Sequence, residues 1–167
     1  MDQIDAILEN YERDLKKATE GQCKKISRCT EFRDSFKKQY QENYAQKLEA
    51  VAMKLAERGH VAEVQERSPE EMHYGLSLQV IPRHLLAPPI DRFHPHHLRS
   101  SISFIANENA LSIDIETVIN PNVEKGAGAS MERIPRQQFD EDLMIRRIGE
   151  FLQKVFHETI LLGFRPL

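Results

Sequence analysis

The feature that most constrains the fold is the stretch from Asp2 to Arg58, which contains no proline and a single glycine, Gly21. Residues that lose little side-chain freedom in a helix dominate it, namely Lys, Glu, Gln, Ala, Leu and Arg. The stretch therefore predicts a long N-terminal helix. We expect the helix to end at Gly59, because glycine readily adopts the left-handed conformation that closes a helix C-terminus.

The first part of this helix carries a coiled-coil pattern. Its apolar residues follow one another at spacings of four, three, four and three: Ile4, Leu8, Tyr11, Leu15 and Ala18. This is the seam of a left-handed coiled coil. A second helix usually covers such a seam, so the pattern predicts a homodimer through residues 4–55 or, as the second choice, a heterotypic helical partner.

After Gly21 the apolar spacing loosens towards eleven residues, which favours a straighter helix. The residues concerned are Cys29, Phe36, Tyr40, Tyr44, Val51 and Leu55. The change of period at Gly21 leaves two interpretations, one continuous helix with a weak point there or a helical hairpin that folds back. We favour the continuous helix, because the joint lacks a clear N-cap.

Beyond Gly59 the periodicity changes from helical to alternating, which indicates strands with one buried face. We expect about four antiparallel strands, beginning with 61–66 and 74–80. A β-hairpin follows, in which the strands around 102–104 and 111–115 flank a turn at 107–109. Residues 121–130 are expected to form a loop. An amphipathic C-terminal helix begins near Asp140 and ends near Gly163.

The predicted fold class is thus α+β, with the C-terminal helix packed on one face of the sheet. We divide the chain into a helical arm, residues 1–58, and a small α+β domain, residues 59–167. The predicted core is the set of apolar positions on the inward faces of these elements: Leu76, Leu78, Val80, Ile102, Phe104, Leu111, Ile113, Ile115, Ile148, Leu152 and Val155.

Composition argues against several locations and partners. The net charge of −3 gives no overall affinity for nucleic acid or membranes. No apolar run approaches the roughly 20 residues that cross a bilayer, and the N-terminus has no signal-peptide pattern. Cys23 and Cys29 point to different faces of the predicted helix, so neither a disulfide nor a two-cysteine metal clip is expected. We expect a cytoplasmic protein.

Histidines cluster in the proline-rich connection at His94, His96 and His97. Imidazole is a common ligand for zinc, copper and nickel, so these three residues are candidate metal ligands. No cysteine or acidic residue stands at an established metal spacing around them, however. A solvated loop is the favoured interpretation, and no cofactor is expected.

A basic stretch in the long helix is the candidate anion-binding site. It consists of Lys16, Lys17, Lys24, Lys25, Arg28, Arg33, Lys37 and Lys38, opposed between them by three acidic residues. Phosphate backbones bind such stripes, and the interleaved aromatics Phe32, Phe36 and Tyr40 are of the kind that stack on bases. The favoured interpretation is structural, with solvated charges and an aromatic seam. Nucleic acid or an anionic surface remains the alternative partner.

Motifs of common catalytic sites are absent. The chain has no GxSxG, HExxH or CxxC motif, and the glycine-rich stretch at 125–130 lacks the order of a phosphate-binding loop. Asp114 and Glu116 share one face of a predicted strand, where a solvated sheet surface is the simpler explanation. The favoured function is therefore that of a non-enzymatic interaction or scaffold protein.

The order of predicted elements resembles that of coiled-coil proteins ending in small globular heads, such as kinetochore components with RWD-type domains. Those domains carry a Tyr-Pro signature between the last strand and the following helix, which is absent here, since the stretch reads Ile119-Asn120-Pro121-Asn122. The resemblance therefore covers element order and transfers no site residue.

Overall fold

The structure, a computed structural model, describes residues 2–67, 73–86, 99–119 and 129–163. Its helical segments are α1 (Asp2–Gln39), the π-helical turn η1 (Tyr40–Tyr44), α2 (Ala45–Glu57) and α3 (Glu141–Gly163), with short 3-10 turns η2 (Arg83–Leu85) and η5 (Arg136–Gln138). Its strands are β1 (Val61–Glu66), β2 (Gly75–Ile81), β3 (Ser100–Asn107), β4 (Ser112–Val118) and β5 (Ala129–Pro135).

The predicted α+β class is confirmed. The strands form one antiparallel sheet in the order β1-β2-β3-β4-β5, a simple meander. The described residues contain five strands instead of about four, because β5 lacks the alternation of apolar and polar residues from which the other strands were predicted. It is an edge strand in which Ile134 is the single buried residue, so no apolar period reveals it.

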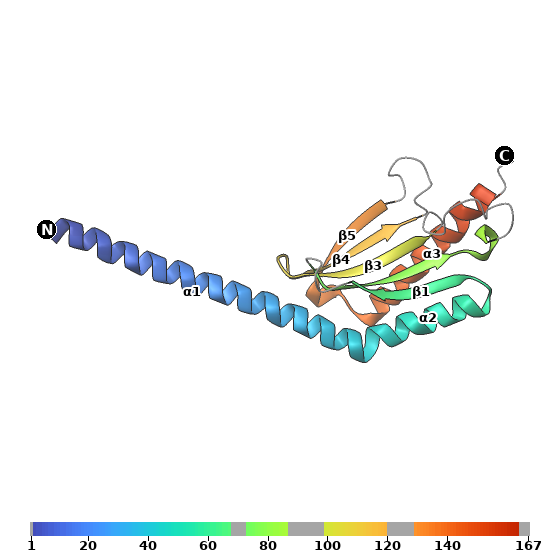
Figure 1. Cartoon of the computed structure of the whole chain (residues 1–167), viewed down its shortest axis with the longest axis horizontal. Helices are drawn as coiled ribbons and strands as arrows, with labels where there is room; N and C mark the ends of the chain where they lie inside the picture. Colours follow the sequence, from blue (N-terminus) through green and yellow to red (C-terminus); the bar gives the residue numbers. More distant parts are fainter. Residues whose placement is uncertain (1, 68–72, 87–98, 120–128, 164–167) are drawn as a thin grey trace.

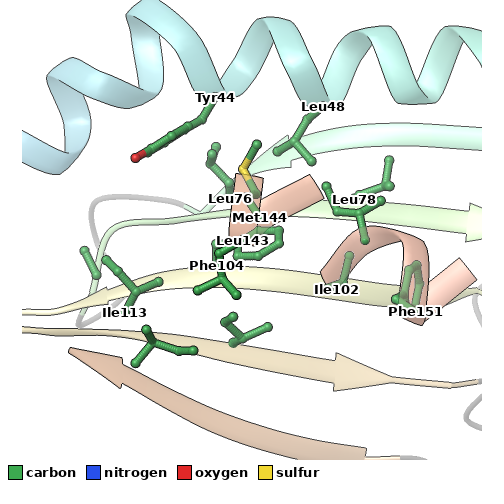
Figure 2. Packing of buried hydrophobic residues seen from close by; sticks show 14 of the residues in the cluster. Tyr44, Leu48, Leu76, Leu78, Ile102, Phe104, Ile113, Leu143, Met144 and Phe151 are labelled. Carbon is green, nitrogen blue, oxygen red and sulfur yellow. The ribbon is translucent and has the colours of Figure 1, made fainter. Parts of the chain in front are cut away.

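The core lies between the sheet and the helices that cover one of its faces. Leu76 and Leu78 of β2 and Phe104 of β3 point towards Leu48 of α2 and Met144 of α3 (Figure 2). All five side chains are almost completely buried. Lys47 and Glu141, whose charged atoms lie 2.9 Å apart, link α2 to α3 on the same face. The predicted packing of the C-terminal helix on the sheet is confirmed.

The N-terminal helix is continuous through Gly21, so the hairpin alternative is wrong for this chain. A Cβ atom added at Gly21 would meet nothing within 4 Å, and no neighbouring element demands a glycine there. The helix bends instead at η1, where the axis of α2 departs from that of α1 (Figure 1). The straighter helix expected after Gly21 therefore gives way to a bend.

The π turn keeps one face of the bent helix on the sheet. The buried or half-buried residues of this face recur every four positions: Phe32, Phe36, Tyr40, Tyr44 and Leu48. Four residues of an α-helix turn about 400°, so such a stripe drifts by about 40° at every step. A π turn has more residues per turn and rotates the stripe back. The bend at η1 thus restores contact between the helix and the core.

The helix α2 ends where the sequence predicted, at Gly59. Gly59 has a φ of 84°, which non-glycine residues rarely adopt. The N–H groups of Gly59 and His60 donate to the carbonyl oxygens of Ala56 and Leu55, the paired closure of a Schellman motif. The chain then reverses directly into β1. The predicted helix stop at Gly59 is confirmed.

One predicted core residue, Leu111, is placed wrongly. It lies in the turn between β3 and β4 with a φ of 50°, and 40 % of its surface is exposed. Asn107 ends β3, and its side-chain oxygen accepts a hydrogen bond from the N–H of Ala110. This Asn-anchored turn extends to Leu111, so β4 begins one residue later than the alternation suggested.

Candidate interaction surface

The exposed part of α1 is the most unusual surface of the molecule. Its first turns project well beyond the sheet (Figure 1). The apolar side chains predicted to form a coiled-coil seam, Ile4, Leu8, Tyr11 and Leu15, are each between 52 % and 62 % exposed. We call the set Ile4, Leu8, Tyr11, Leu15 and Ala18 the arm seam.

The same helical stripe is buried where α1 reaches the sheet domain. Cys29, Phe32 and Phe36 follow Leu8, Tyr11 and Leu15 by three heptads each. Phe32 and Phe36 belong to the hydrophobic core, and Cys29 is half-buried. The same heptad positions of α1 are therefore apolar and open in its first part, polar at Gln22 and Lys25, and apolar again where the sheet domain covers them.

Polar contacts fix α1 to the β3–β4 turn and to η5. The Cys29 thiol donates a hydrogen bond of 3.2 Å to the backbone oxygen of Glu108, and the Glu108 carboxylate lies 3.7 Å from the Arg33 guanidinium. The Arg136 guanidinium donates to the Ser35 hydroxyl at 2.6 Å and lies over the Phe32 ring, 5.5 Å from its centroid. Before Cys29 no contact of this kind is found among the described residues.

A groove lies where the arm meets the sheet domain, between α1 and the β3–β4 turn. Its volume is about 350 Å³. Lys24, Lys25 and Arg28 line the helical side, while Glu108 and Leu111 line the other. The groove is thus basic along α1 and partly apolar at the exposed Leu111. Sequence reasoning missed it, because nothing in the sequence predicts that this turn lies beside α1.

All eight predicted anion-binding residues are exposed on α1. Lys24, Lys25 and Arg28 are brought together with the groove, whereas Arg33 is engaged by Asp34 and Glu108. The aromatics that interleave with them are not free to stack on bases. Phe32 and Phe36 are buried, and Tyr40 is half-buried with its ring 5.4 Å from that of Tyr74.

Charge is distributed unevenly along the projecting helix. Residues 2–14 hold five acidic residues and one basic, a net charge of −4. Residues 15–28 hold five basic residues and one acidic, a net charge of +4. The basic half was recognised from the sequence as an anion-binding candidate. The acidic half is also evident from the sequence, and it gives the two ends of the arm opposite charges.

The candidate metal ligands His94, His96 and His97 lie outside the described residues, so their assignment stays a prediction. Within the described residues, no group of three or more His, Cys, Asp or Glu side chains is placed to hold a metal ion. Likewise, none of the helices in the described ranges has the length and apolar character that crossing a bilayer requires.

The polar face of the sheet carries a charged cluster around Asp114. The buried carboxylate of Asp114 accepts hydrogen bonds from Arg133 at 2.8 and 3.2 Å and from the Asn107 amide at 2.8 Å. The Arg133 guanidinium holds the pKa of Asp114 below its ordinary value, against the opposing effect of burial. A carboxylate so engaged stays ionised and cross-links β3, β4 and β5, a structural role.

Comparison with known proteins yields no relative. No known protein family matches the chain, no curated protein matches its sequence significantly, and no solved structure matches its fold significantly. The features of the molecule itself therefore carry the functional argument.

Proposed function

We propose that this protein is a non-enzymatic interaction or scaffold protein that forms a homodimer through its N-terminal helix. The arm seam carries the proposal, because it is an apolar stripe at heptad spacing that the chain itself leaves more than half exposed. The sheet domain at the other end of the helix would then be presented to further partners. From its composition we place this assembly in the cytoplasm.

The energetics of a lone helix support an assembly. Residues 3–28 are exposed and precede Cys29, where the first hydrogen bond to the sheet domain is found among the described residues, so this segment has little tertiary packing of its own. Isolated helices in water are marginal, because most helical stability in proteins comes from packing of the apolar face. Burying a side chain such as Leu8 fully gains about 1.5–3 kcal/mol. A second helix on the arm seam would therefore stabilise both copies.

The test is the solution mass of the full chain by size exclusion with light scattering. The wild-type chain should elute at twice the monomer mass of 19.4 kDa. Leu8→Glu/Leu15→Glu places two charges in the arm seam and should yield monomers. The matched control, Gln3→Glu/Asn10→Glu, adds the same charge at exposed polar positions of the same helix and should remain dimeric.

Circular dichroism provides a second readout. Helical content should fall on dilution of the wild-type chain and should be lower in the Leu8→Glu/Leu15→Glu variant at every concentration. A wild-type monomer with full helical content at micromolar concentration would contradict the proposal. So would a dimer that the seam substitutions leave intact.

A second candidate is binding of an anionic partner, favoured by the clustering of Lys24, Lys25 and Arg28 at the groove. Such binding would weaken steeply with salt, because counterions are released from the polyanion. A labelled duplex RNA titrated at low and high NaCl provides the assay. Lys24→Gln/Lys25→Gln should lose most of the affinity, while Lys37→Gln/Lys38→Gln, exposed further along α1, serves as the control.

A further inference from the structure

The charge pattern of α1 and the position of the sheet domain bear on the orientation of the dimer, which rests on the proposed function. We propose that the partner on the arm seam is a second copy of this chain running antiparallel, with its N-terminal turn at the groove between α1 and the β3–β4 turn. The two sheet domains then stand at opposite ends of a shared two-helix rod.

Charge complementarity is the first argument. In a parallel pair, the acidic halves at residues 2–14 would lie side by side, and so would the basic halves at residues 15–28. Like charges across a helix pair repel, and no compensating charge lies between them. In an antiparallel pair at the register described below, residues 2–14, with a net charge of −4, face residues 12–24 of the other copy, with a net charge of +1, and this pairing occurs twice. The arm is therefore complementary to its own reverse.

The position of the sheet domain is the second, independent argument. This domain covers α1 from Cys29 to Phe36, which occupy the same heptad positions as the arm seam beyond the polar positions Gln22 and Lys25. A parallel second helix that followed the stripe would run into the domain. An antiparallel second helix carries its own sheet domain at the opposite end of the pair, so the two domains do not compete for the same part of either helix. The open half of the stripe thus has room for a reversed arm.

Heptad geometry limits the register to choices seven residues apart, and we take the one that covers Ala18 and brings the acidic turns to the groove. Core layers of an antiparallel pair match unlike seam positions, which places Tyr11 opposite Leu15 and Leu8 opposite Ala18 of the second copy. Ile4 then lies at the level of Gln22, and Asp2 lies at the level of Lys24. The acidic first turns of one copy thereby reach Lys24, Lys25 and Arg28 of the other, which line the groove.

Fluorescence energy transfer between singly labelled full-length chains distinguishes the orientations. Cys23→Ser/Cys29→Ser removes the native thiols, and the serine hydroxyl at position 29 keeps a donor for the Glu108 carbonyl. Labels are attached at Gln3→Cys or Ser27→Cys, both exposed. In the antiparallel register these two positions differ by about 6 Å along the axis, but in a parallel pair by about 36 Å.

With a dye pair of short transfer range, the expected result is strong transfer in the mixture of Gln3→Cys and Ser27→Cys chains and weak transfer in each like-labelled mixture, whose labels lie about 30 Å or more apart along the axis. Strong transfer between Gln3→Cys chains with weak transfer in the mixed pair would mean a parallel dimer. That outcome overturns this inference and leaves the proposed function intact. No transfer in any mixture, together with a monomer mass, would overturn the proposed function itself.

Charge reversal supplies a readout independent of the labels. Asp5→Lys/Glu9→Lys/Glu12→Lys makes both halves of the arm basic. An antiparallel dimer would then bring like charges together and weaken by about tenfold or more. In a parallel dimer, contact between two acidic halves would be replaced by contact between two basic halves, and the affinity would be kept. Raising NaCl should weaken the wild-type dimer, whereas a dimer that tightens with salt refutes the antiparallel arrangement.

Discussion

The segment between Phe32 and Glu57 should be indispensable to the sheet domain, although the sequence assigns it to the arm. Fragment 22–167 removes the projecting turns and keeps every residue of the helix that packs on the sheet. Fragment 59–167 removes the packed part as well. We expect fragment 22–167 to retain the stability of the full-length fold and fragment 59–167 to be unfolded.

The expected loss of stability follows from the apolar side chains that the removed helix buries against the sheet. The removed helix contributes five side chains that are each at least 92 % buried: Phe32, Phe36, Tyr44, Leu48 and Leu55. At about 1.5–3 kcal/mol each, their burial stabilises the fold by roughly 7–15 kcal/mol, an upper bound because unfolded chains are partly compact. Domains of this size have a total stability of about 5–15 kcal/mol. The expected free energy of unfolding of fragment 59–167 is therefore about zero or below.

Urea unfolding followed by circular dichroism is the assay, with two point variants of the full chain as matched controls. Leu48→Ala empties a site with no exposed surface and should lower the free energy of unfolding by about 2–5 kcal/mol. Met53→Ala truncates a side chain on the same helix that is 65 % exposed, and should change it by less than about 0.5 kcal/mol. A cooperative transition of fragment 59–167 at the midpoint of fragment 22–167 would refute the reasoning.

Three further outcomes test the structure at other points. Gly75→Ala should destabilise the fold by about 1–3 kcal/mol, because the added Cβ would lie 3.0 Å from the Phe104 backbone oxygen. Gly149→Ala has open space around the added Cβ and should stabilise α3 by up to about 1 kcal/mol. The same urea experiment measures both. Asp114→Asn should lower the free energy of unfolding by about 1–2 kcal/mol at pH 7. Because the folded-state pKa of Asp114 lies below its ordinary value, this deficit should shrink as titration proceeds below about pH 4, and a deficit independent of pH would contradict the ion pair. Deleting Gln41 should convert the π turn to α-helix and cost more stability than Gln41→Ala, a comparison that thermal unfolding makes directly.

Local rules predicted most of the elements, and tertiary contacts explain the departures. Gly59 determines its helix end through its own backbone, so the sequence was sufficient there. The strand β5 was not predictable, since an edge strand with one buried residue has no periodic signature. Leu111 was misplaced because alternation cannot locate the last residue of a turn. The bend at η1 depends on a stripe at four-residue spacing that must remain on the sheet, which is visible only once the sheet is present.

The interaction surface shows a more general limit of periodicity. Leu8 and Cys29 occupy equivalent heptad positions, as do Tyr11 and Phe32, so the sequence pattern does not distinguish them. One member of each pair meets the sheet domain and the other meets solvent, because the domain reaches only as far as the β3–β4 turn. Periodicity identifies the face of a helix that another element will cover. The extent of the sheet domain determines how much of that face the chain covers itself and how much is left for a partner. On this chain the charge asymmetry of residues 2–28 is the remaining signal, and it is the reason we propose a reversed copy of the same helix as the partner.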